Sequence, residues 1–469
     1  MEQPNTERFI FRVKKSIKAD PVRFIKHLQN SKILHFDFIV NIIEGYVELL
    51  VGDMNSHKEI WIYLLVFCEE IVSLPKFWEK PEGNGQEYLT ANYSWVVSSI
   101  ADAIRSGTSD DKFAFEAELL PVSRRILEII LENQEGEAFS DKCDAVSISI
   151  NSSRGKCIEA LINYALRRCR LADKTKSGRA KIWHSDLKFL FEKEFSKISD
   201  SNHEFVTLFA NYLPNFIYLD RDWTLEHLPL AFDKDNEKNW SLAFQGYSYV
   251  GQAHPDIYQF LKDGQHFQKG SDFQDFEILV KNKIIQIIAV AYVQGDETLE
   301  ENGLMHHLNE RQNVDELQEL IWFIWTFRGS IIEDLNDKII ALWDMIDAKN
   351  NAQNKPDRDI LGKLSTWCVF IDKIKEGTKQ LMINSVMFSD FGYDSYIIIE
   401  ELRRLVDSQP YEVAEINLKM MEGTHPTYEQ ENIEYILQIL LQGDSKTRSL
   451  AAKIRDIYIE NGIGFVAQL

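Results

Sequence analysis

The chain has no glycine-rich loop of the kinds that hold phosphate groups. No such loop ends in a Lys-Ser or Lys-Thr pair, and no strand-like run leads into a Gly-x-Gly-x-x-Gly turn. These loops present backbone N–H groups to the phosphates of a nucleotide or dinucleotide. Their absence argues against an ATPase or a nicotinamide-dependent enzyme, and we predict no cofactor.

Long apolar runs are missing too. Residues 1–19 alternate apolar side chains with lysines, so we expect no secretory leader. The most apolar stretch, 278–293, is interrupted by Lys281, Lys283 and Gln286 and is shorter than the roughly 20 residues that a bilayer requires. We therefore expect no membrane span and predict a buried helix at 278–293, with a strand as the alternative because Ile and Val are frequent there.

Cysteines at metal-ligand spacing are absent. The five cysteines are scattered, which is typical of buried free thiols in a reducing compartment, so we expect a cytoplasmic protein with no metal site. His306 and His307 are adjacent and point in different directions on a helix. An alternative, enzymatic site would have to combine dispersed side chains, namely His184, His203, His254, His266, Asp256, Asp263 and Glu310.

Positive charge is in the minority, with 52 Lys and Arg against 73 Asp and Glu and a formal net charge of -21. A surface of that sign repels polyanions, which argues against nucleic acid or an anionic membrane as the partner. One basic cluster departs from this balance and comprises Arg167, Arg168, Arg170, Lys174, Lys176, Arg179 and Lys181. Such a cluster could bind an acidic surface of a partner protein, and the alternative is a solvated helix end.

Amphipathic helices are predicted for nearly the whole chain. In the segment 151–171 the apolar residues recur three and four positions apart, which places them on one face of a helix. These residues are Cys157, Ile158, Leu161, Ile162, Ala165, Leu166 and Cys169. Asn151 or Ser152 can cap the start of this helix. A similar stripe at 398–406 predicts a second helix, which we expect Pro410 to stop.

A chain of 469 residues exceeds the roughly 250–300 residues at which one core stops growing, so its core must be divided or spread along an array. We predict an all-α fold, an irregular HEAT-like helical-repeat solenoid or superhelix of antiparallel helix pairs. One long helix is expected at 109–133. Polar breaks at 132–150 and 348–359 delimit three predicted subdomains, 1–135, 151–347 and 358–469.

Two groups of aromatic residues stand out. The first comprises Trp322, Phe323, Trp325 and Phe327, and the second comprises Trp240, Phe244, Tyr247 and Tyr249. Most such side chains pack in a core. If some of them line a groove, they are natural anchors for a protein ligand.

The segment 151–162 reads Asn-Ser-Ser-Arg-Gly-Lys-Cys-Ile-Glu-Ala-Leu-Ile. It resembles an Asn-Ser-x-Arg-Gly-x-x-x-Glu-Ala-Leu pattern in the helical regions of bacterial antiphage-defence proteins, and 240–258 and 394–414 are similar to later blocks of those regions. Such regions typically follow a sirtuin-like, nuclease or nucleotide-binding effector module and serve as sensor or scaffold. The resemblance implies a role in binding a phage-derived or partner protein and coupling that event to a separate effector.

The sequence therefore predicts a non-enzymatic protein-recognition scaffold, which could also form a homo-oligomer. The predicted partner-binding residues are Arg154, Glu159, Arg167, Arg168, Arg170, Lys174, Lys176 and Arg179. For Arg154 and Glu159 the alternative is a bridge between adjacent helices, and Gly155 is expected to allow a neighbouring backbone to approach. The alternative function is an enzyme or nucleic-acid-processing subunit, with the basic cluster as a substrate clamp.

Overall fold

The chain divides into two compact units, Met1–Val250 and Gly251–Leu469. The computed structural model describes residues 12–28, 35–52, 58–79, 92–136, 144–175, 178–199 and 202–469. Within these ranges the regular structure is helical and contains no strand, which confirms the predicted all-α helical-repeat fold. The three subdomain ranges expected from the sequence stay a prediction.

The first unit begins with helical residues 12–19. The helices that follow are α2 (Pro21–Leu28), α3 (Phe36–Gly52), α4 (Lys58–Val72), η1 (Pro75–Trp78), α5 (Tyr93–Ser109), η2 (Ala117–Leu119), α6 (Leu120–Asn133), α7 (Ala145–Asn151) and α8 (Ser153–Lys174). The unit continues with α9 (Arg179–Ile182), η3 (Trp183–Leu187), α10 (Lys188–Phe195), α11 (Glu204–Asn211), α12 (Leu213–Leu219), α13 (Arg221–Ala231) and α14 (Glu237–Ser248). In this unit α3, α5, α8, α11 and α14 pack in succession, while α2, α4 and α6 form a second row.

Helix α8 is the centre of the first unit and has the features that its sequence predicts. All seven apolar residues of the predicted stripe are buried. The Ser152 hydroxyl caps the helix by accepting a hydrogen bond from the backbone N–H of Gly155, at 2.9 Å. A Cβ atom on Gly155 would lie 1.7 Å from the backbone oxygen of Ser149, so glycine is required for α7 and α8 to approach this closely.

Two segments of the first unit differ from the prediction. The expected helix at 109–133 is wrong, because α5 ends at Ser109 and a loop precedes η2 and α6. The backbone is extended at Asp110, and the buried ring of Phe115 fills the space beside Gly107. The expected break at 132–150 contains α7, which packs against α8, α11 and α14. Tertiary packing therefore overrides the low helix propensity of Val146, Ile148 and Ile150.

The second unit is built from α15 (Pro255–Asp263), α16 (His266–Asp272), α17 (Ile278–Gln294), α18 (Leu304–Arg311), α19 (Val314–Trp325), α20 (Leu335–Asn351), α21 (Arg358–Leu364) and η4 (Ser365–Phe370). It continues with α22 (Glu376–Ser385), η5 (Val386–Phe388), α23 (Tyr393–Leu405), α24 (Pro410–Met420), α25 (Gln430–Gln442), α26 (Ser445–Glu460) and η6 (Gly464–Val466). Pro410 does not stop α23, which ends at Leu405. It occupies the first turn of α24, where its missing N–H group costs no hydrogen bond.

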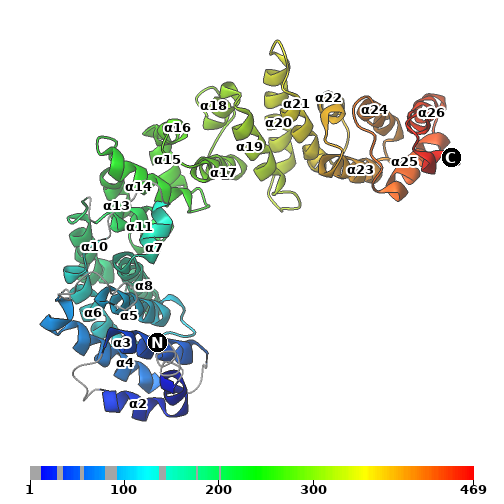
Figure 1. Cartoon of the computed structure of the whole chain (residues 1–469). Coiled ribbons are helices and arrows are strands. Elements are labelled where there is room, and N and C mark those ends of the chain that lie inside the picture. Colours follow the sequence, from blue (N-terminus) through cyan, green and yellow to red (C-terminus); the bar gives the residue numbers. More distant parts are fainter. Residues whose placement is uncertain are drawn as a thin grey trace, which may run out of the picture. The chain divides into compact units, whose positions relative to one another are not determined.

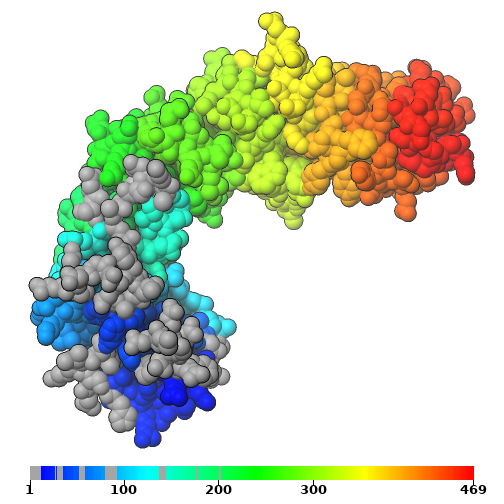
Figure 2. Space-filling model, viewed as in Figure 1, coloured from blue at the N-terminus to red at the C-terminus, as the bar shows by residue number. Residues whose placement is uncertain are grey.

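Consecutive helices of the second unit alternate between two rows. Helices α17, α19, α21 with η4, α23 and α25 pack in one row, and α18, α20, α22, α24 and α26 pack in the other (Figure 1). In the space-filling view, side chains fill the spaces between the ribbons of successive helices (Figure 2). We call the row from α17 to α25 the odd row, because it carries the pocket described below.

The apolar stretch at 278–293 forms α17, so the predicted helix is confirmed. Most of its apolar side chains are buried between neighbouring helices, and Ile278 and Leu279 at its start are exposed. Among the described helices, none combines the length and the apolar character that crossing a bilayer demands.

Candidate functional site

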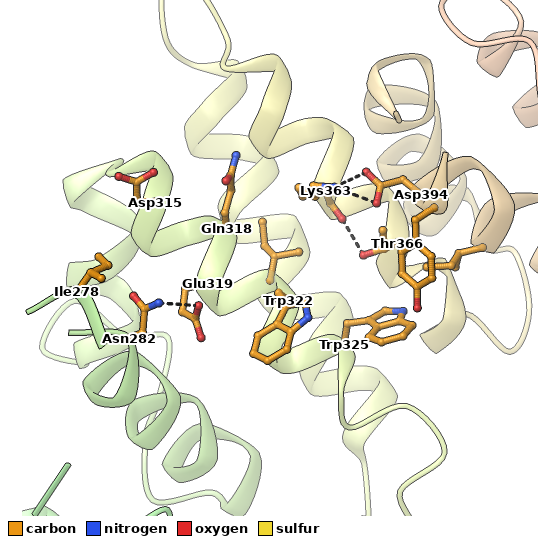
Figure 3. Close-up of a pocket in the computed structure, with 13 residues that line it drawn as sticks. Ile278, Asn282, Asp315, Gln318, Glu319, Trp322, Trp325, Lys363, Thr366 and Asp394 are labelled. Atoms are coloured by element: carbon orange, nitrogen blue, oxygen red, sulfur yellow. Dashed lines mark hydrogen bonds and ion pairs between the residues drawn. The ribbon is translucent and has the colours of Figure 1, made fainter. Parts of the chain in front are cut away.

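A pocket with a volume of about 550 Å³ opens on the odd row of the second unit (Figure 3). Four successive elements of the row contribute to it, namely α17, α19, α21 with η4, and α23. The lining residues are Ile278, Asn282, Asp315, Gln318, Glu319, Ile321, Trp322, Trp325, Lys363, Thr366, Tyr393, Asp394 and Ile397. The pocket is thus made by the stacking of helices rather than by one helix alone.

Two tryptophans of α19 form the apolar wall of the pocket. Asn313 caps this helix, and Leu317, Leu320, Ile321 and Ile324 are buried. Trp322 and Trp325, three residues apart, therefore lie toward the pocket on the same face. The side chain of Trp322 is 56% exposed, which is unusual for so large an apolar group.

Trp325 is held by contacts on two sides. Its ring meets Tyr393 edge-on, with the ring centroids 5.7 Å apart. The guanidinium carbon of Arg328 lies 3.2 Å from the centroid of the Trp325 ring, in a cation–π contact. Tyr393 is itself exposed, and so are Phe391 and Tyr428, whose ring centroids lie 6.3 Å apart. Exposed aromatic side chains thus occur on α19, at the start of α23 and just before α25.

An ion pair closes one side of the pocket. The Nζ atom of Lys363 lies 2.9 Å from Asp394 Oδ2 and 3.4 Å from Asp390 Oδ2. The Asp394 side chain is almost completely buried. Burial raises the pKa of its carboxyl above the ordinary value, and the hydrogen bond from Lys363 partly opposes that rise. The Lys363 charge is therefore engaged within the protein.

Two further carboxylates lie on the α17 side of the pocket. Glu319 accepts hydrogen bonds from the side-chain amides of Asn282, at 3.0 Å, and Gln286, at 2.8 Å. These amides join α17 to α19 and fix the orientation of the carboxylate. Asp315 lies one turn earlier on α19 and is exposed.

The two predicted aromatic groups differ in burial. Trp240, Phe244 and Tyr247 are buried in the first unit, so that group belongs to the core except for the partly exposed Tyr249. In the other group Trp322 is exposed, and Phe323, Trp325 and Phe327 are partly exposed. The latter group contributes Trp322 and Trp325 to the pocket.

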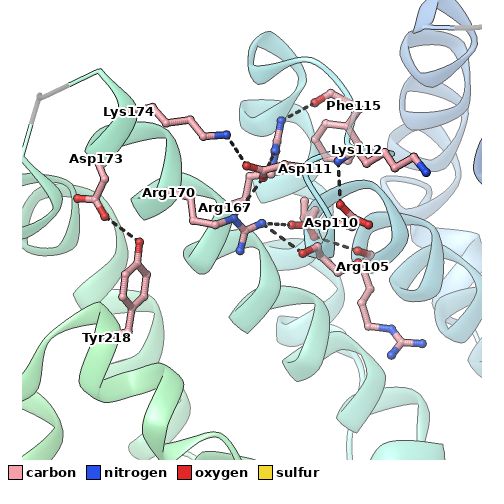
Figure 4. Close-up of polar contacts among 12 residues, drawn as sticks. Arg105, Asp110, Asp111, Lys112, Phe115, Arg167, Arg170, Asp173, Lys174 and Tyr218 are labelled. Carbon is pink, nitrogen blue, oxygen red and sulfur yellow. Dashed lines mark hydrogen bonds and ion pairs between the residues drawn. The ribbon is translucent and has the colours of Figure 1, made fainter. Parts of the chain in front are cut away.

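Three members of the basic cluster pair with one acidic residue of the first unit, Asp111 (Figure 4). Arg167 Nη1 lies 2.6 Å from Asp111 Oδ1, Arg170 Nε lies 3.2 Å from the same oxygen, and Lys174 pairs with Oδ2. The hydrogen bond from Lys174, together with the nearby arginines, lowers the pKa of Asp111 to about 2. Arg170 also donates to the backbone oxygen of Thr108 at 2.7 Å, and Arg167 to that of Phe115. These cations fasten α8 to the loop after α5.

Arg168 and Arg179 of the cluster have local partners as well. Arg168 pairs with Asp186. The guanidinium carbon of Arg179 lies 4.3 Å from the Tyr218 ring centroid, and its Nη1 lies 3.6 Å from Asp173. Lys176 is outside the described residues. Among the described members of the predicted partner-binding set, Lys174 and Arg179 have the most exposed side chains, so a partner protein could reach them.

Arg154 and Glu159 lie in the interior of the first unit. Arg154 pairs with Glu194 and donates to the backbone oxygens of Leu131, at 3.2 Å, and Gln134, at 2.8 Å. Glu159 accepts a 2.6 Å hydrogen bond from the hydroxyl of Tyr212. Their placement therefore matches the helix-bridging alternative rather than a surface that contacts a ligand.

The histidines that the sequence analysis singled out are distributed over several helices. His306 and His307 lie on α18, His266 is stacked on Phe260, and His254 precedes α15. His307 and Glu310 line a second pocket of about 380 Å³. In the described ranges no three His, Cys, Asp or Glu side chains are grouped so that they could hold a metal ion. Cys68, Cys157, Cys169 and Cys368 are buried free thiols, and Cys143 is outside the described residues.

No protein-family model matches the chain, and no curated protein matches it in sequence. A search of solved structures finds similarity to a chain described as "Crystal structure of Kap121p bound to Nup53p", with 12% sequence identity and a TM-score of 0.24. The match covers 96% of this chain and 45% of the matched chain, so the present chain spans less than half of that chain's length.

Sequence reasoning missed most of the pocket. Lys363, Tyr393 and Asp394 had no sequence signal, since they reach the pocket only because α21 and α23 pack beside α19. The aromatic spacing around Trp322 was the available signal, and it identified one wall of the site.

Proposed function

We propose that the chain is a protein-recognition scaffold and that the pocket around Trp322 binds a segment of a partner protein. The observation that carries the proposal is the 56% exposure of Trp322 in a pocket that Trp325 and Tyr393 also line. Tryptophan and tyrosine dominate binding energy when they become buried at the centre of an interface. A stacked helical array suits this role because it presents an extended surface on which successive helices each contribute contacts.

The pocket chemistry favours binding over the enzyme alternative. Its described lining residues include neither histidine nor cysteine, and its lysine is engaged by Asp394 and Asp390. An enzyme would be expected to place a nucleophile or base against a group that orients it. The second pocket, which contains His307 and Glu310, is the place where the enzyme alternative should be sought.

The biological setting that we propose is bacterial antiphage defence, with a phage-derived protein or an effector subunit as the partner. This part of the proposal is supported by the resemblance of 151–162 to the helical regions of such proteins. In that setting the scaffold passes the binding event to a separate effector through a change in its helix packing or oligomeric state.

The test is affinity capture of the tagged chain from host cells, with and without phage infection, read by quantitative mass spectrometry at two salt concentrations. Wild type is compared with Trp322→Ala and with Trp95→Ala. Trp95 is the matched control because it is exposed to a similar extent, at 58%, and lies on α5 of the other unit.

A stoichiometric partner that is retained by Trp95→Ala and lost by Trp322→Ala supports recognition at the pocket. Its appearance only after infection supports the defence setting. Equal capture by both variants contradicts a role for the pocket. A co-purified nucleotide, metal or nucleic acid accompanied by turnover would favour the enzyme alternative.

A further inference from the structure

The charges that line the pocket do not balance. Asp315, Glu319 and Asp394 face a single lysine among the described lining residues, and that lysine is already paired with Asp394 and Asp390. Within the described ranges, neither Asp315 nor Glu319 forms an ion pair with a lysine, arginine or histidine. The α17 side of the pocket therefore carries surplus negative charge.

Glu319 is positioned to bind a cation. The side chain is only partly exposed, and a partly buried charge without a counter-ion is costly. The amides of Asn282 and Gln286 each donate one hydrogen bond to its oxygens, but a carboxylate can accept about four. These neutral donors leave both the charge of Glu319 and part of its acceptor capacity for a ligand.

Trp322 provides a second site for the same cation. It follows Glu319 by three residues on α19, so the two side chains are neighbours on the helix surface (Figure 3). The face of an indole ring attracts a guanidinium or ammonium group. Trp325 shows this chemistry within the chain, since Arg328 is stacked on its ring.

Apolar side chains lie at both ends of the pocket, beside the charged residues there. Ile278 lies at one end and is exposed, and Tyr393 and Ile397 lie at the other. A ligand that places a cation beside Glu319 would therefore contact apolar side chains on both sides of it. An acidic segment would instead meet Asp315 and Glu319, and like charges at an interface are repulsive.

We infer that the pocket takes a lysine or arginine side chain from an otherwise apolar segment of the partner protein, with the cation stacked on Trp322 and paired with Glu319. This inference rests on the proposed function and names the partner chemistry for the same site. It concerns a different surface from the basic cluster of the first unit, for which the sequence favours an acidic partner surface.

The experiment selects peptides from a displayed random library on the purified full-length chain, with counter-selection on Trp322→Ala. The enriched peptides are synthesised and titrated by fluorescence anisotropy against wild type, Asp315→Asn, Glu319→Gln and the double variant. Glu300→Gln and Trp95→Ala are the controls, because Glu300 and Trp95 are exposed and lie outside the pocket. Circular dichroism melts confirm that each variant is folded, and Asp315→Asn alters only an exposed position.

We expect enrichment of peptides with a lysine or arginine flanked by apolar residues. The double variant should bind them about tenfold more weakly, an effect that shrinks at high salt, and the controls should stay within about twofold of wild type. Replacing the lysine of a peptide by norleucine, or its arginine by citrulline, should weaken binding by a similar factor.

Peptides that require Trp322 but lack a basic residue, or that bind the double variant with wild-type affinity, overturn the inference and leave the proposed function standing. If no selected peptide depends on Trp322, that result contradicts both the inference and the proposed function of the pocket.

Discussion

Arg167 and Asp111 form an ion pair with 2.6 Å between Nη1 and Oδ1, although 56 positions separate them in the sequence. The pair joins the last turns of α8 to the loop that follows α5. Arg170 and Lys174 bind the same carboxylate, so one acidic residue gathers three members of the basic cluster. The cluster therefore stabilises the packing of α8 against the loop after α5, and its charge is partly neutralised within the first unit.

This arrangement predicts a pH dependence of stability. The pKa of Asp111 is lowered to about 2 in the folded chain, against about 3.9 in an unfolded one. A lowered pKa means that the ionised form is favoured by folding, so its stabilisation is complete above about pH 5 and is lost as the pH falls toward 2. Asp111→Asn should destabilise the first unit by about 1 kcal/mol at pH 7, because the carboxylate is partly exposed and its ion pairs are screened.

The measurement is urea unfolding of wild type and Asp111→Asn between pH 7 and pH 2.5. The difference in unfolding free energy should shrink steadily below about pH 4. Asp110→Asn is the control, since the neighbouring Asp110 forms no ion pair among the described residues. A difference that stays constant down to pH 2.5 would show that the Asp111 charge is not the cause.

The sequence was sufficient for α8 but not for this cluster. Periodicity located α8 and its buried face because those features depend on spacing along one helix. The partner of the arginines was missed because 109–133 was expected to be one helix, whereas Phe115 packs beside Gly107 and forces a loop. That loop brings Asp111 to α8, and no local pattern encodes the contact.

The pocket illustrates the same limit. Aromatic spacing singled out Trp322 and Trp325, but burial depends on which neighbours cover them, and the similar group at Trp240 is in the core. Lys363 and Asp394 are 31 positions apart and meet only because α23 packs against η4, which directly continues α21. The packing of helices that are distant in the sequence therefore determines which of the predicted aromatic anchors are exposed.

The buried pair of Arg154 and Glu194 predicts a large loss of stability. Each side chain is about 2% exposed, and Arg154 also supplies hydrogen bonds to two backbone oxygens at the end of α6. Arg154→Met should cost about 3 kcal/mol, because the Gln134 oxygen loses the Arg154 donor and the buried Glu194 charge keeps only its ion pair with Lys197. Arg105→Met, at an exposed arginine, should cost less than about 0.5 kcal/mol.

Urea unfolding gives the total effect, and hydrogen exchange of peptides from α6 and α8 assigns it to the first unit. Adding Glu194→Leu to Arg154→Met should recover part of the loss, because it removes the buried Glu194 charge, whose remaining ion pair is with the partly exposed Lys197. A single variant as stable as wild type would contradict the structural role of Arg154.

Gly155 tests the close contact between α7 and α8, and Gly377 is the comparison at an open position. Gly155→Ala places a Cβ atom against the Ser149 oxygen and should destabilise the first unit by about 2 kcal/mol or more. Gly377 lies in α22 with open space around its Cα, so Gly377→Ala should stabilise the second unit by about 0.5 kcal/mol. Thermal melts of both variants give the comparison. Equal effects of the two substitutions would show that the α7–α8 contact is looser than described.

Charge reversal within the basic cluster separates its packing role from any contact with a partner. Arg167→Glu should destabilise the first unit by about 3 kcal/mol, because the almost buried side chain would face Asp111 with the same charge. Arg179→Glu should change stability by about 0.5 kcal/mol, since the Arg179 side chain is more exposed and its ion pair with Asp173 is long. Melting curves test both expectations, and capture of the partner by the folded Arg179→Glu variant tests the surface role. Unchanged capture would confine partner binding to other surfaces, whereas weaker capture with an unchanged melting curve would make Arg179 part of an interface in the first unit.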